Sequence, residues 1–324
     1  MQAVVHTKYG PPEVLRLREV KKPIVKDNEV LIKIRAATVN TGDCELRRFQ
    51  VHILFWLFLR IKMGIIKPKQ DTILGQEVAG EIEAVGSKVT EFKKGDQVIA
   101  QTGFVFGAYA EYVCLPTKYA IAIKPNNLSW QEAAAVPVGG ANALHFMRRA
   151  NIKPGQTVLI YGSSGSIGTM AIQLAKYYGA EVTAVCSTAK VALVKSLGAT
   201  HVIDYTQEDF SKSGQRYDVV FETIGKCPFS KCLKVLKDKG TLLIANPKLV
   251  EMFRAIWVSN ASEKKVMFAF ADHTSEDLLI LKALIEEKKL KTIIDDNRFT
   301  LAQTAEAHRY VEKGHKTGNV VITV

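Results

Sequence analysis

The first third of the chain alternates apolar and polar positions with the two-residue period of a β-strand. Such runs occur at residues 30–39, 77–85, 97–100 and 108–115, and a shorter strand-like run opens the chain at residues 2–6. Glycines lie between the runs, where they favour turns. Short strands at close spacing are typical of an antiparallel barrel or sandwich. We therefore predict a small antiparallel β domain in this part of the chain.

The pattern changes near residue 125. Ser129 and Glu132 have the spacing of a capping box, which predicts the start of a helix. Pro137, Gly139 and Gly140 are expected to break that helix, and a second helix should follow to about residue 150.

From Pro154 onward, apolar strand patterns alternate with helical ones. The predicted strands lie at 157–161, 181–186, 201–203, 218–222 and 241–245, and the predicted helices between the first of them lie near 166–178 and 190–197. This alternation is typical of βαβ units, which form a parallel sheet with helices on both faces.

The tail holds two helical patterns and a final strand. One helix is predicted at 275–289 with Ser275 as its cap, and a shorter one at 301–313 ends before Gly314. The last strand, at 320–324, could extend the parallel sheet or return to the N-terminal β domain, and the pattern leaves both open.

One segment, at residues 51–66, is unusually apolar. Seven consecutive apolar residues, 53–59, precede Arg60 and Lys62. Crossing a bilayer takes ~20 apolar residues, so the segment is too short to be a transmembrane helix. We predict a helix that is buried or lies at an interface, with contact to a membrane surface as the less favoured alternative.

Composition and charge narrow the class of protein. The chain has 324 residues, 47% of them apolar, and 44 Lys and Arg against 32 Asp and Glu give a net charge of +12. A length above ~250–300 residues favours about two domains. The basic residues are scattered in pairs, which indicates solubility and attraction for anionic ligands rather than nucleic-acid binding.

Five scattered cysteines, and a strand-like start at Met1, predict reduced thiols and a cytoplasmic location.

The most specific chemical signal is the glycine turn after the strand at 157–161. It is a variant of G-x-G-x-x-G in which Ser163 takes the place of the first glycine and Gly165 and Gly168 follow. Such a turn directs backbone N–H groups at the start of a helix toward a pyrophosphate. Gly165 lets the ligand approach the backbone, and Gly168 lets the helix pack on the strand. The segment therefore predicts dinucleotide binding.

The second strand of this unit predicts which dinucleotide is bound. An Asp or Glu usually follows the glycine turn by ~20 residues and binds the ribose of NAD. Here Ser187 lies nineteen residues after Gly168, with Thr188 and Lys190 behind it and no acid. Hydroxyl groups and an ammonium suit a 2′-phosphate, which favours NADPH over NADH.

Several further motifs together resemble the medium-chain dehydrogenase/reductase superfamily over essentially the whole chain. They include the segments at 75–80, 85–89, 92–98, 133–137, 196–199, 203–205 and 308–321. The resemblance implies an α/β fold with a GroES-like β-barrel catalytic domain, at 1–125 and 268–324, and a doubly wound Rossmann NADP-binding domain at 126–267. It also implies a homodimer.

Two substitutions separate the chain from the zinc alcohol dehydrogenases of that superfamily. Asn40 stands where they carry a catalytic Cys, and Gln76 stands where they carry a His. Zinc selects thiolate, imidazole and carboxylate, so neither residue suits it. The family's four clustered cysteines are also absent. The chain therefore resembles the zinc-free quinone oxidoreductase branch, with Glu77 expected to be structural.

The resemblance also assigns site residues. Asn40, in the stretch Asn40–Asp43, would line the nicotinamide pocket and act as the catalytic residue. The set expected to bind the cofactor is Asn40, Asn142, Ser163, Ser164, Gly165, Ser166, Ile167, Gly168, Ser187, Lys190 and Tyr205. Ser164 to Ile167 would hold the pyrophosphate, while Ser187, Lys190 and Tyr205 would face the 2′-phosphate.

The expected activity is NADPH-dependent hydride transfer to quinones or related activated carbonyl acceptors, without a metal. The first alternative is reduction of the double bond of 2-alkenals or enoyl compounds. The second is an NADPH-binding sensor or structural protein with little turnover. The helix predicted at 53–59 would lie beside the nicotinamide cleft and contact an apolar acceptor or a second subunit.

Overall fold

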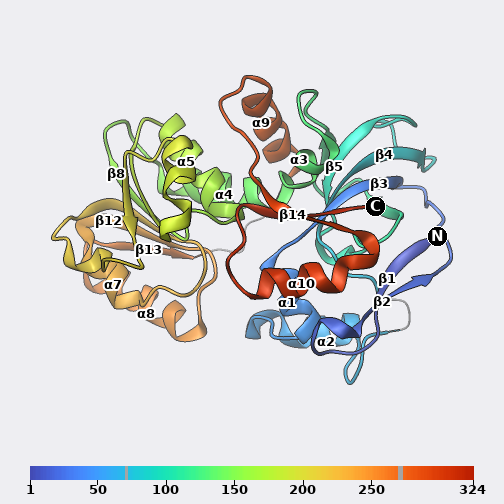
Figure 1. The fold of residues 1–324 in the computed structure, drawn as a ribbon, viewed down its shortest axis with the longest axis horizontal. Coiled ribbons are helices and arrows are strands. Elements are labelled where there is room, and N and C mark those ends of the chain that lie inside the picture. The colour runs from blue at the N-terminus through green and yellow to red at the C-terminus, as the bar shows by residue number, and fades with distance from the viewer. Residues whose placement is uncertain (70–71, 269–272) are drawn as a thin grey trace. The chain divides into compact units, whose positions relative to one another are not determined.

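A computed structural model describes residues 1–69, 72–268 and 273–324 (Figure 1). The chain divides into two compact units. The first comprises Met1–Val138, His273–Lys288 and Thr292–Val324, and the second comprises Gly139–Asp272 and Lys289–Lys291.

The first unit is built on a mainly antiparallel sheet. Its strands are β3 (Glu29–Val39), β4 (Glu77–Val85), β5 (Gln97–Gln101), β6 (Tyr112–Pro116), β7 (Ile121–Ile123), β14 (Ile294–Thr300) and β15 (Asn319–Thr323). The order is β14-β15-β3-β4-β5-β7, and β6 pairs with the first half of β3. A separate hairpin joins β1 (Gln2–His6) to β2 (Leu15–Glu19). Alternate apolar side chains of β3, β4 and β5 point into one core, so the predicted β domain is confirmed.

The final strand, β15, belongs to this sheet. It pairs antiparallel with β3, in the register Val320 to Val39, and parallel with β14. The tail of the chain therefore returns to the N-terminal β domain, which settles the alternative that the sequence left open.

Short helices surround this sheet. They are α1 (Thr41–Arg48), α2 (Ile53–Met63), α3 (Trp130–Ala134), α9 (Ser275–Glu286) and α10 (Thr304–Glu312), with 3-10 turns η1 (Pro12–Val14), η2 (Gly103–Val105) and η5 (Leu301–Gln303). The capping box at the start of α3 is confirmed, because the Ser129 hydroxyl accepts from the N–H of Glu132. The predicted cap of α9 is wrong by one residue. Thr274 caps the helix, and the Ser275 hydroxyl instead accepts from the N–H of Ile121.

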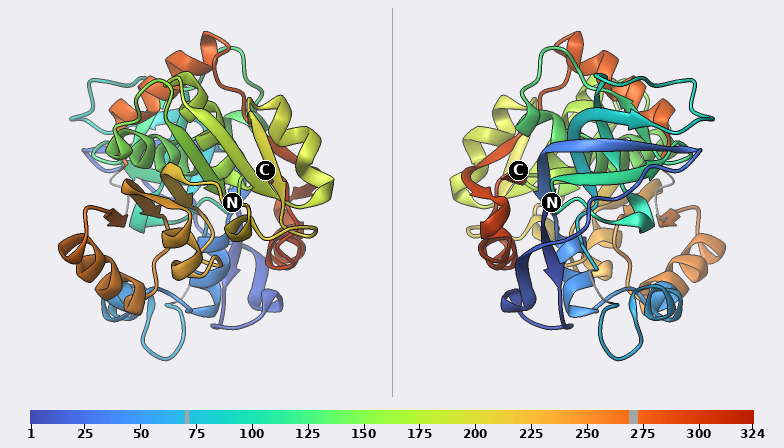
Figure 2. Two further views of the ribbon diagram at one scale, coloured as in Figure 1. Left: turned by 90° about the vertical axis from the view of Figure 1, so that its left-hand side faces the viewer. Right: turned by 90° about the vertical axis from the view of Figure 1, so that its right-hand side faces the viewer.

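The second unit is a six-stranded parallel sheet with helices. Its strands are β8 (Thr157–Tyr161), β9 (Glu181–Cys186), β10 (His201–Asp204), β11 (Tyr217–Glu222), β12 (Leu236–Ile244) and β13 (Lys265–Phe268). Their order, β10-β9-β8-β11-β12-β13, reverses between β8 and β11. This is the doubly wound arrangement, in which ligands bind at the carboxyl ends of the strands where the order reverses. The left panel of Figure 2 shows this unit facing the viewer.

Five helices accompany the sheet: α4 (Pro137–Ala150), α5 (Ser166–Tyr177), α6 (Val191–Ser196), α7 (Phe229–Lys234) and α8 (Leu249–Ala261), with 3-10 turns η3 (Thr188–Lys190) and η4 (Phe210–Lys212). The predicted break between two helices is confirmed, because α3 ends at Ala134 and α4 runs from Pro137 to Ala150. Gly139 and Gly140 lie inside α4, so the expectation that they contribute to the break is wrong. Pro137 is the first residue of α4, where its missing N–H costs nothing. Gly139 instead allows close packing, because a Cβ there would lie 2.3 Å from the Ser166 Oγ.

The predicted strand at 108–115 begins only at Tyr112. The residues before Tyr112 bond to two other segments of the chain. The Tyr109 N–H donates to the Leu74 carbonyl, and the Tyr109 carbonyl accepts from the Val4 N–H. That bridging role keeps this part of the segment out of the regular ladder.

Candidate cofactor and active site

The glycine turn of the second unit connects the central strand β8 to helix α5. Gly162 has a positive φ of 81°, and a Cβ there would lie 2.6 Å from the Thr223 Oγ1. A Cβ on Gly168 would lie 2.3 Å from the Gly162 carbonyl oxygen. Both glycines are therefore required by packing within the turn, and Gly168 has the role that its spacing predicts.

Gly165 differs from these two glycines. Its φ is −82°, and the nearest atom to a Cβ there is the Gly162 carbonyl oxygen at 3.6 Å. Packing therefore leaves room in front of the turn. Gly165 is also the N-cap of α5 and provides no side-chain acceptor for the first N–H groups of the helix. Open space before a helix start that no side chain caps fits a pyrophosphate.

Ser164, Ser166 and Ile167 lie in this turn and are half-buried. Ser163 is fully buried, and its hydroxyl donates to the Val185 carbonyl at 2.8 Å. The side chain of Ser163 thus ties the turn to β9, which is an internal role that the glycine pattern does not predict.

The residues expected at the 2′-phosphate come together at the ends of β9 and β10. Cys186 pairs with Asp204 in the parallel register, and the Tyr205 N–H donates to the Cys186 carbonyl at 3.0 Å. Ser187 therefore lies beside Tyr205, whose side chain is about half exposed, and the half-buried Lys190 ends the turn η3 that follows Ser187.

Asp204 adds a carboxylate to this edge of the sheet. One of its oxygens accepts from the Thr188 hydroxyl, and the other accepts from the N–H and hydroxyl of Thr206. The hydrogen bond from Thr188 is the main cause that lowers the pKa of Asp204. The carboxylate is thus engaged by two threonines of the loops that carry Ser187 and Tyr205.

Glu222, which is not among the residues predicted from the sequence, shapes the loop after β11. Its buried carboxylate accepts hydrogen bonds from the backbone N–H groups of residues 224–227, the shortest from Gly225 at 2.7 Å. This loop packs against Gly162 through Thr223 and Ile224. Glu222 therefore fixes the loop that follows β11, next to the glycine turn at the β8–β11 switch point. The signal available in the sequence was an acidic residue at the end of an apolar strand, shortly before Gly225.

Asn142 lies in α4, one turn after Gly139, and is half-buried. Because Gly139 packs against Ser166, this part of α4 lies close to the start of α5 within the second unit.

In the first unit, Asn40 connects β3 to α1. Its side-chain oxygen accepts from the Asp43 N–H, and the Asp43 carboxylate accepts from the Asn40 N–H, both at 3.0 Å. The Gln76 amide donates to the Asn40 oxygen at 3.4 Å and to the Asp43 carboxylate at 3.2 Å. The register of β3 and β4, with Ala37 opposite Val78, brings these residues together.

This three-residue network is largely closed. Burial raises the pKa of the Asp43 carboxyl to about 6, although its hydrogen bonds to Asn40 and Gln76 oppose the shift. The Asn40 amide nitrogen is buried and has no hydrogen-bond partner among the described residues. A buried donor of this kind favours a polar acceptor on a ligand.

Behind the network lies Glu77, which is fully buried. It accepts from the Thr38 hydroxyl and from the Val138 N–H at 2.7 Å, and burial raises its pKa to about 7. These bonds connect the start of β4 to β3 and to Val138 within the first unit, which agrees with the structural role expected for Glu77. Burial also lowers the pKa of Lys316 to about 8, and the charge of Glu77 opposes that shift.

Among the described residues, no three His, Cys, Asp or Glu side chains are grouped so that they could hold a metal ion. His308 is fully buried, with its Nδ1 3.4 Å from the Cys44 Sγ, and burial lowers its pKa to about 3. His308 is therefore a packing residue that joins α10 to α1.

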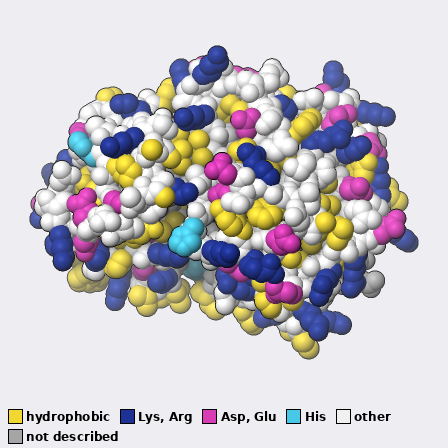
Figure 3. All heavy atoms as spheres, viewed as in Figure 1, with side chains coloured by type: hydrophobic (Ala, Val, Ile, Leu, Met, Phe, Trp, Pro, Cys, Tyr) yellow, Lys and Arg dark blue, Asp and Glu magenta, His cyan; other side chains and the backbone are white. Residues whose placement is uncertain are grey.

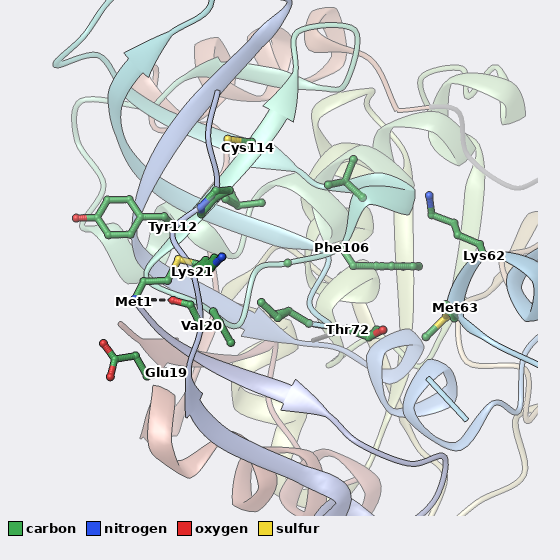
Figure 4. A pocket seen from close by; sticks show the side chains of 15 residues that line it. Met1, Glu19, Val20, Lys21, Lys62, Met63, Thr72, Phe106, Tyr112 and Cys114 are labelled. Atoms are coloured by element: carbon green, nitrogen blue, oxygen red, sulfur yellow. Dashed lines mark hydrogen bonds between the residues drawn. The ribbon is translucent and has the colours of Figure 1, made fainter. Parts of the chain in front are cut away.

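The first unit also has an open pocket of about 870 Å³ beside β6 and the end of α2 (Figure 4). Its lining includes Met1, Lys21, Lys62, Phe106 and Tyr112. None of the residues expected in the active site lines this pocket.

Known protein families match segments of both units. Residues 26–125 match the family model of the alcohol dehydrogenase GroES-like domain, and residues 197–322 match that of zinc-binding dehydrogenases. An NADPH-dependent alkenal/one oxidoreductase of Arabidopsis thaliana is 33% identical over 99% of this chain and 79% of its own length. A quinone-oxidoreductase homolog of Spinacia oleracea is 33% identical over 99% and 98%.

Among solved structures, the quinone oxidoreductase of Coxiella burnetii matches with a TM-score of 0.90 and 31% identity, and covers 100% of this chain and 99% of its own. A GroES-like domain joined to a doubly wound nucleotide-binding unit is the architecture of one class of two-domain oxidoreductases. The chain belongs to the medium-chain dehydrogenase/reductase superfamily, in its quinone oxidoreductase-like branch.

Proposed function

We propose that the chain is a zinc-independent, NADPH-dependent reductase that transfers hydride to quinones or related activated carbonyl acceptors. The observation that carries this proposal is the hydrogen-bonded network of Asn40, Asp43 and Gln76. Asn40 and Gln76 replace the family's zinc-binding Cys and His with amides, and zinc prefers thiolate and imidazole. The one carboxylate of the network already accepts from Asn40 and Gln76.

Residues of the second unit would hold the cofactor. The N–H groups of Ser164 to Ile167 bind the pyrophosphate in this proposal, at the open space before Gly165. Ser187, Lys190 and Tyr205 hold the 2′-phosphate, and Asn142 lies near the nicotinamide. When bound, the cofactor supplies a hydride from its reduced nicotinamide ring.

In the first unit, the buried amide nitrogen of Asn40 donates to a polar group of the bound reactants. Asp43 and Gln76 orient the Asn40 amide. The N–H groups of both residues donate to its side-chain oxygen, and the Asp43 carboxylate accepts from the Asn40 backbone N–H. With no Lewis acid in the proposed site, the preferred acceptors are compounds that already accept hydride well. Catalysis then depends mainly on the position of the reactants.

The choice of NADPH is supported by two observations. The carboxylate that would bind the ribose of NAD is replaced by Ser187 at the end of β9, and Lys190 follows it. In addition, the Arabidopsis relative is named as NADPH-dependent.

A second candidate is reduction of the double bond of 2-alkenals or enones. It is favoured by the same relative, whose name includes alkenals and enones as substrates. A third candidate, an NADPH-binding sensor with little turnover, differs from both because it would not consume NADPH.

One experiment separates the three candidates. The purified chain is mixed with NADPH and a panel of quinones, 2-alkenals and saturated ketones, and NADPH consumption is followed by its absorbance. We expect turnover with quinones above all. Turnover confined to 2-alkenals would select the second candidate, and NADPH binding without turnover on any acceptor would select the third.

The proposal includes a homodimer and a cytoplasmic location. Mass measurement in solution and cell fractionation test them. Lys and Arg are spread among Asp and Glu over the visible face of the molecule (Figure 3), which supports a small ligand rather than a nucleic acid. No helix in the described part of the chain is long and apolar enough to span a bilayer.

A further inference from the structure

Helix α2 of the first unit presents an apolar face to solvent. Phe55, Leu59 and Met63, one on each turn, pack against the core of the unit. Arg60 and Lys62 interrupt the rest of the helix, Trp56 is 40% exposed, and the five remaining apolar side chains are each 49–65% exposed. They are Ile53, Leu54, Leu57, Phe58 and Ile61. The predicted helix is confirmed, but only one of its faces is buried.

The exposed face extends beyond the helix. Ile65 and Ile66, which follow it, are 70% and 90% exposed. Phe104 from the turn η2 lies against Phe58, with ring centroids 5.2 Å apart, and is 41% exposed. We call the set Ile53, Leu54, Leu57, Phe58, Ile61, Ile65, Ile66 and Phe104 the α2 surface. Contiguous apolar surface of this kind marks a contact with a partner or a membrane.

The chain segment that carries α2 is rich in basic residues. Residues 46–70 contain six Lys and Arg and no Asp or Glu. Arg47 and Arg48 pair with Glu312, and Arg60 lies over the Phe49 ring at 3.8 Å. The remaining cations, Lys62, Lys67 and Lys69, are exposed and form no ion pair within the described part of the chain. Figure 4 shows the Lys62 side chain extending from α2 beside the pocket.

These charges distinguish between two possible partners of the α2 surface, a second copy of the chain and an anionic lipid surface. A two-fold interface centred on the α2 surface would place the same patch on both copies. It would bring Lys62, Lys67 and Lys69 of each copy near those of the other, with no acid in residues 46–70 to offset them. An anionic lipid surface supplies the missing negative charge, and Trp, Phe and Leu bordered by Lys and Arg are typical of helices that lie in a membrane interface.

We infer that the α2 surface docks the protein onto an anionic phospholipid bilayer, with α2 lying in the plane of the interface. Eleven helical residues extend about 16 Å, which is half of the ~30 Å hydrocarbon core, so the helix lies on the bilayer and does not cross it. The inference goes beyond the proposed reductase activity and does not depend on the acceptor.

The test is flotation of the full chain with vesicles of phosphatidylcholine alone or mixed with phosphatidylglycerol. We expect binding to the mixed vesicles, and weaker binding as salt shortens the range of the charges. The combined variant Leu57→Gln/Phe58→Gln should lower the partition coefficient by about tenfold or more. Ile24→Gln is the matched control, because Ile24 is 87% exposed outside the α2 surface.

A second variant tests the charges, and fluorescence tests the location. The change Lys62→Gln/Lys67→Gln/Lys69→Gln should weaken binding about fivefold for each lysine removed. The chain has three tryptophans. Trp130→Phe/Trp257→Phe leaves Trp56 as the single reporter, and its emission should shift to shorter wavelength on mixed vesicles. Unfolding temperature and NADPH affinity in solution verify that the variants are folded.

Three results would overturn the inference. The first is wild-type protein that does not bind mixed vesicles. The second is binding that Leu57→Gln/Phe58→Gln lowers no more than Ile24→Gln does, or that the lysine variant leaves unchanged. The third is a wild-type dimer that Leu57→Gln/Phe58→Gln converts to monomers, which would assign the α2 surface to a second copy.

Discussion

At the scale of single residues, burial of the Asp43 carboxyl makes the stability of the fold depend on pH. Burial raises the pKa of this carboxyl to about 6, against about 3.9 in an unfolded chain. Between these values the folded protein binds more protons, so the Asp43 contribution lowers the free energy of unfolding as pH rises. Asp43→Asn removes this contribution. The free energy of unfolding of the variant minus that of wild type should therefore rise by up to about 3 kcal/mol from pH 4 to pH 7, as measured by urea unfolding.

The control for this prediction is Asp296→Asn, because Asp296 is exposed. Its stability relative to wild type should be the same at both pH values. A difference between Asp43→Asn and wild type that does not change with pH would contradict the assigned burial of the carboxyl.

Lys190 tests the cofactor proposal at the same scale. Lys190→Ala should weaken NADPH binding by about 1.5–3 kcal/mol, since a charge-assisted contact to the 2′-phosphate is lost. NADH lacks that phosphate, so its affinity should stay nearly the same. Fluorescence titration with both cofactors measures the two dissociation constants. Equal losses for NADPH and NADH would show that Lys190 acts elsewhere.

The sequence indicates candidate residues for the site, but it does not show how they interact with one another. Asn40 and Gln76 were identified from their positions in the family pattern. That Gln76 donates to both Asn40 and Asp43 depends on the register of β3 and β4, which residues far apart in the chain do not reveal. The same holds for Glu222, whose four backbone partners follow from the shape of one loop.

At the scale of secondary-structure elements, the β8–α5 turn offers a matched pair of variants. Gly165→Ala places its Cβ in open space at a φ that alanine adopts, so it should cost less than about 1 kcal/mol of stability. The methyl group would fill the space before the helix start, and affinity for NADPH and NADH should both fall by about tenfold or more. Gly168→Ala meets the Gly162 carbonyl oxygen and should destabilise the fold by about 1–3 kcal/mol.

Urea unfolding and cofactor titration on both variants check this pair. The interpretation of the turn as a phosphate cradle fails if Gly165→Ala binds both cofactors as wild type does. It also fails if Gly165→Ala loses more stability than Gly168→Ala.

The strongly periodic elements were predicted closely. β8 and β9 have the predicted bounds, and α5 ends one residue earlier, because apolar strands and an amphipathic helix are local patterns. β14 and α8 were not predicted. β14 has mostly polar, exposed residues and is a strand because β15 pairs with it. α8 exposes Phe253 and Trp257, so no simple buried stripe marks it.

At the scale of the whole molecule, the two-domain class followed from the order of patterns along the chain. The return of β15 to the first unit did not, since it depends on pairing with β3 across most of the chain length. The relatives confirm the class, because the Spinacia protein aligns over 98% of its length. The proposed chemistry is hydride transfer from NADPH at a site that has amides where the zinc alcohol dehydrogenases of the superfamily carry Cys and His.

Turnover and metal content, measured on one preparation, test that claim most directly. The protein is analysed for zinc, and NADPH oxidation with a quinone is then followed with and without a chelator. Because Asn40 and Gln76 are poor zinc ligands, we predict no stoichiometric zinc and an unchanged rate in the presence of the chelator. One zinc per chain together with activity that the chelator abolishes would contradict the account.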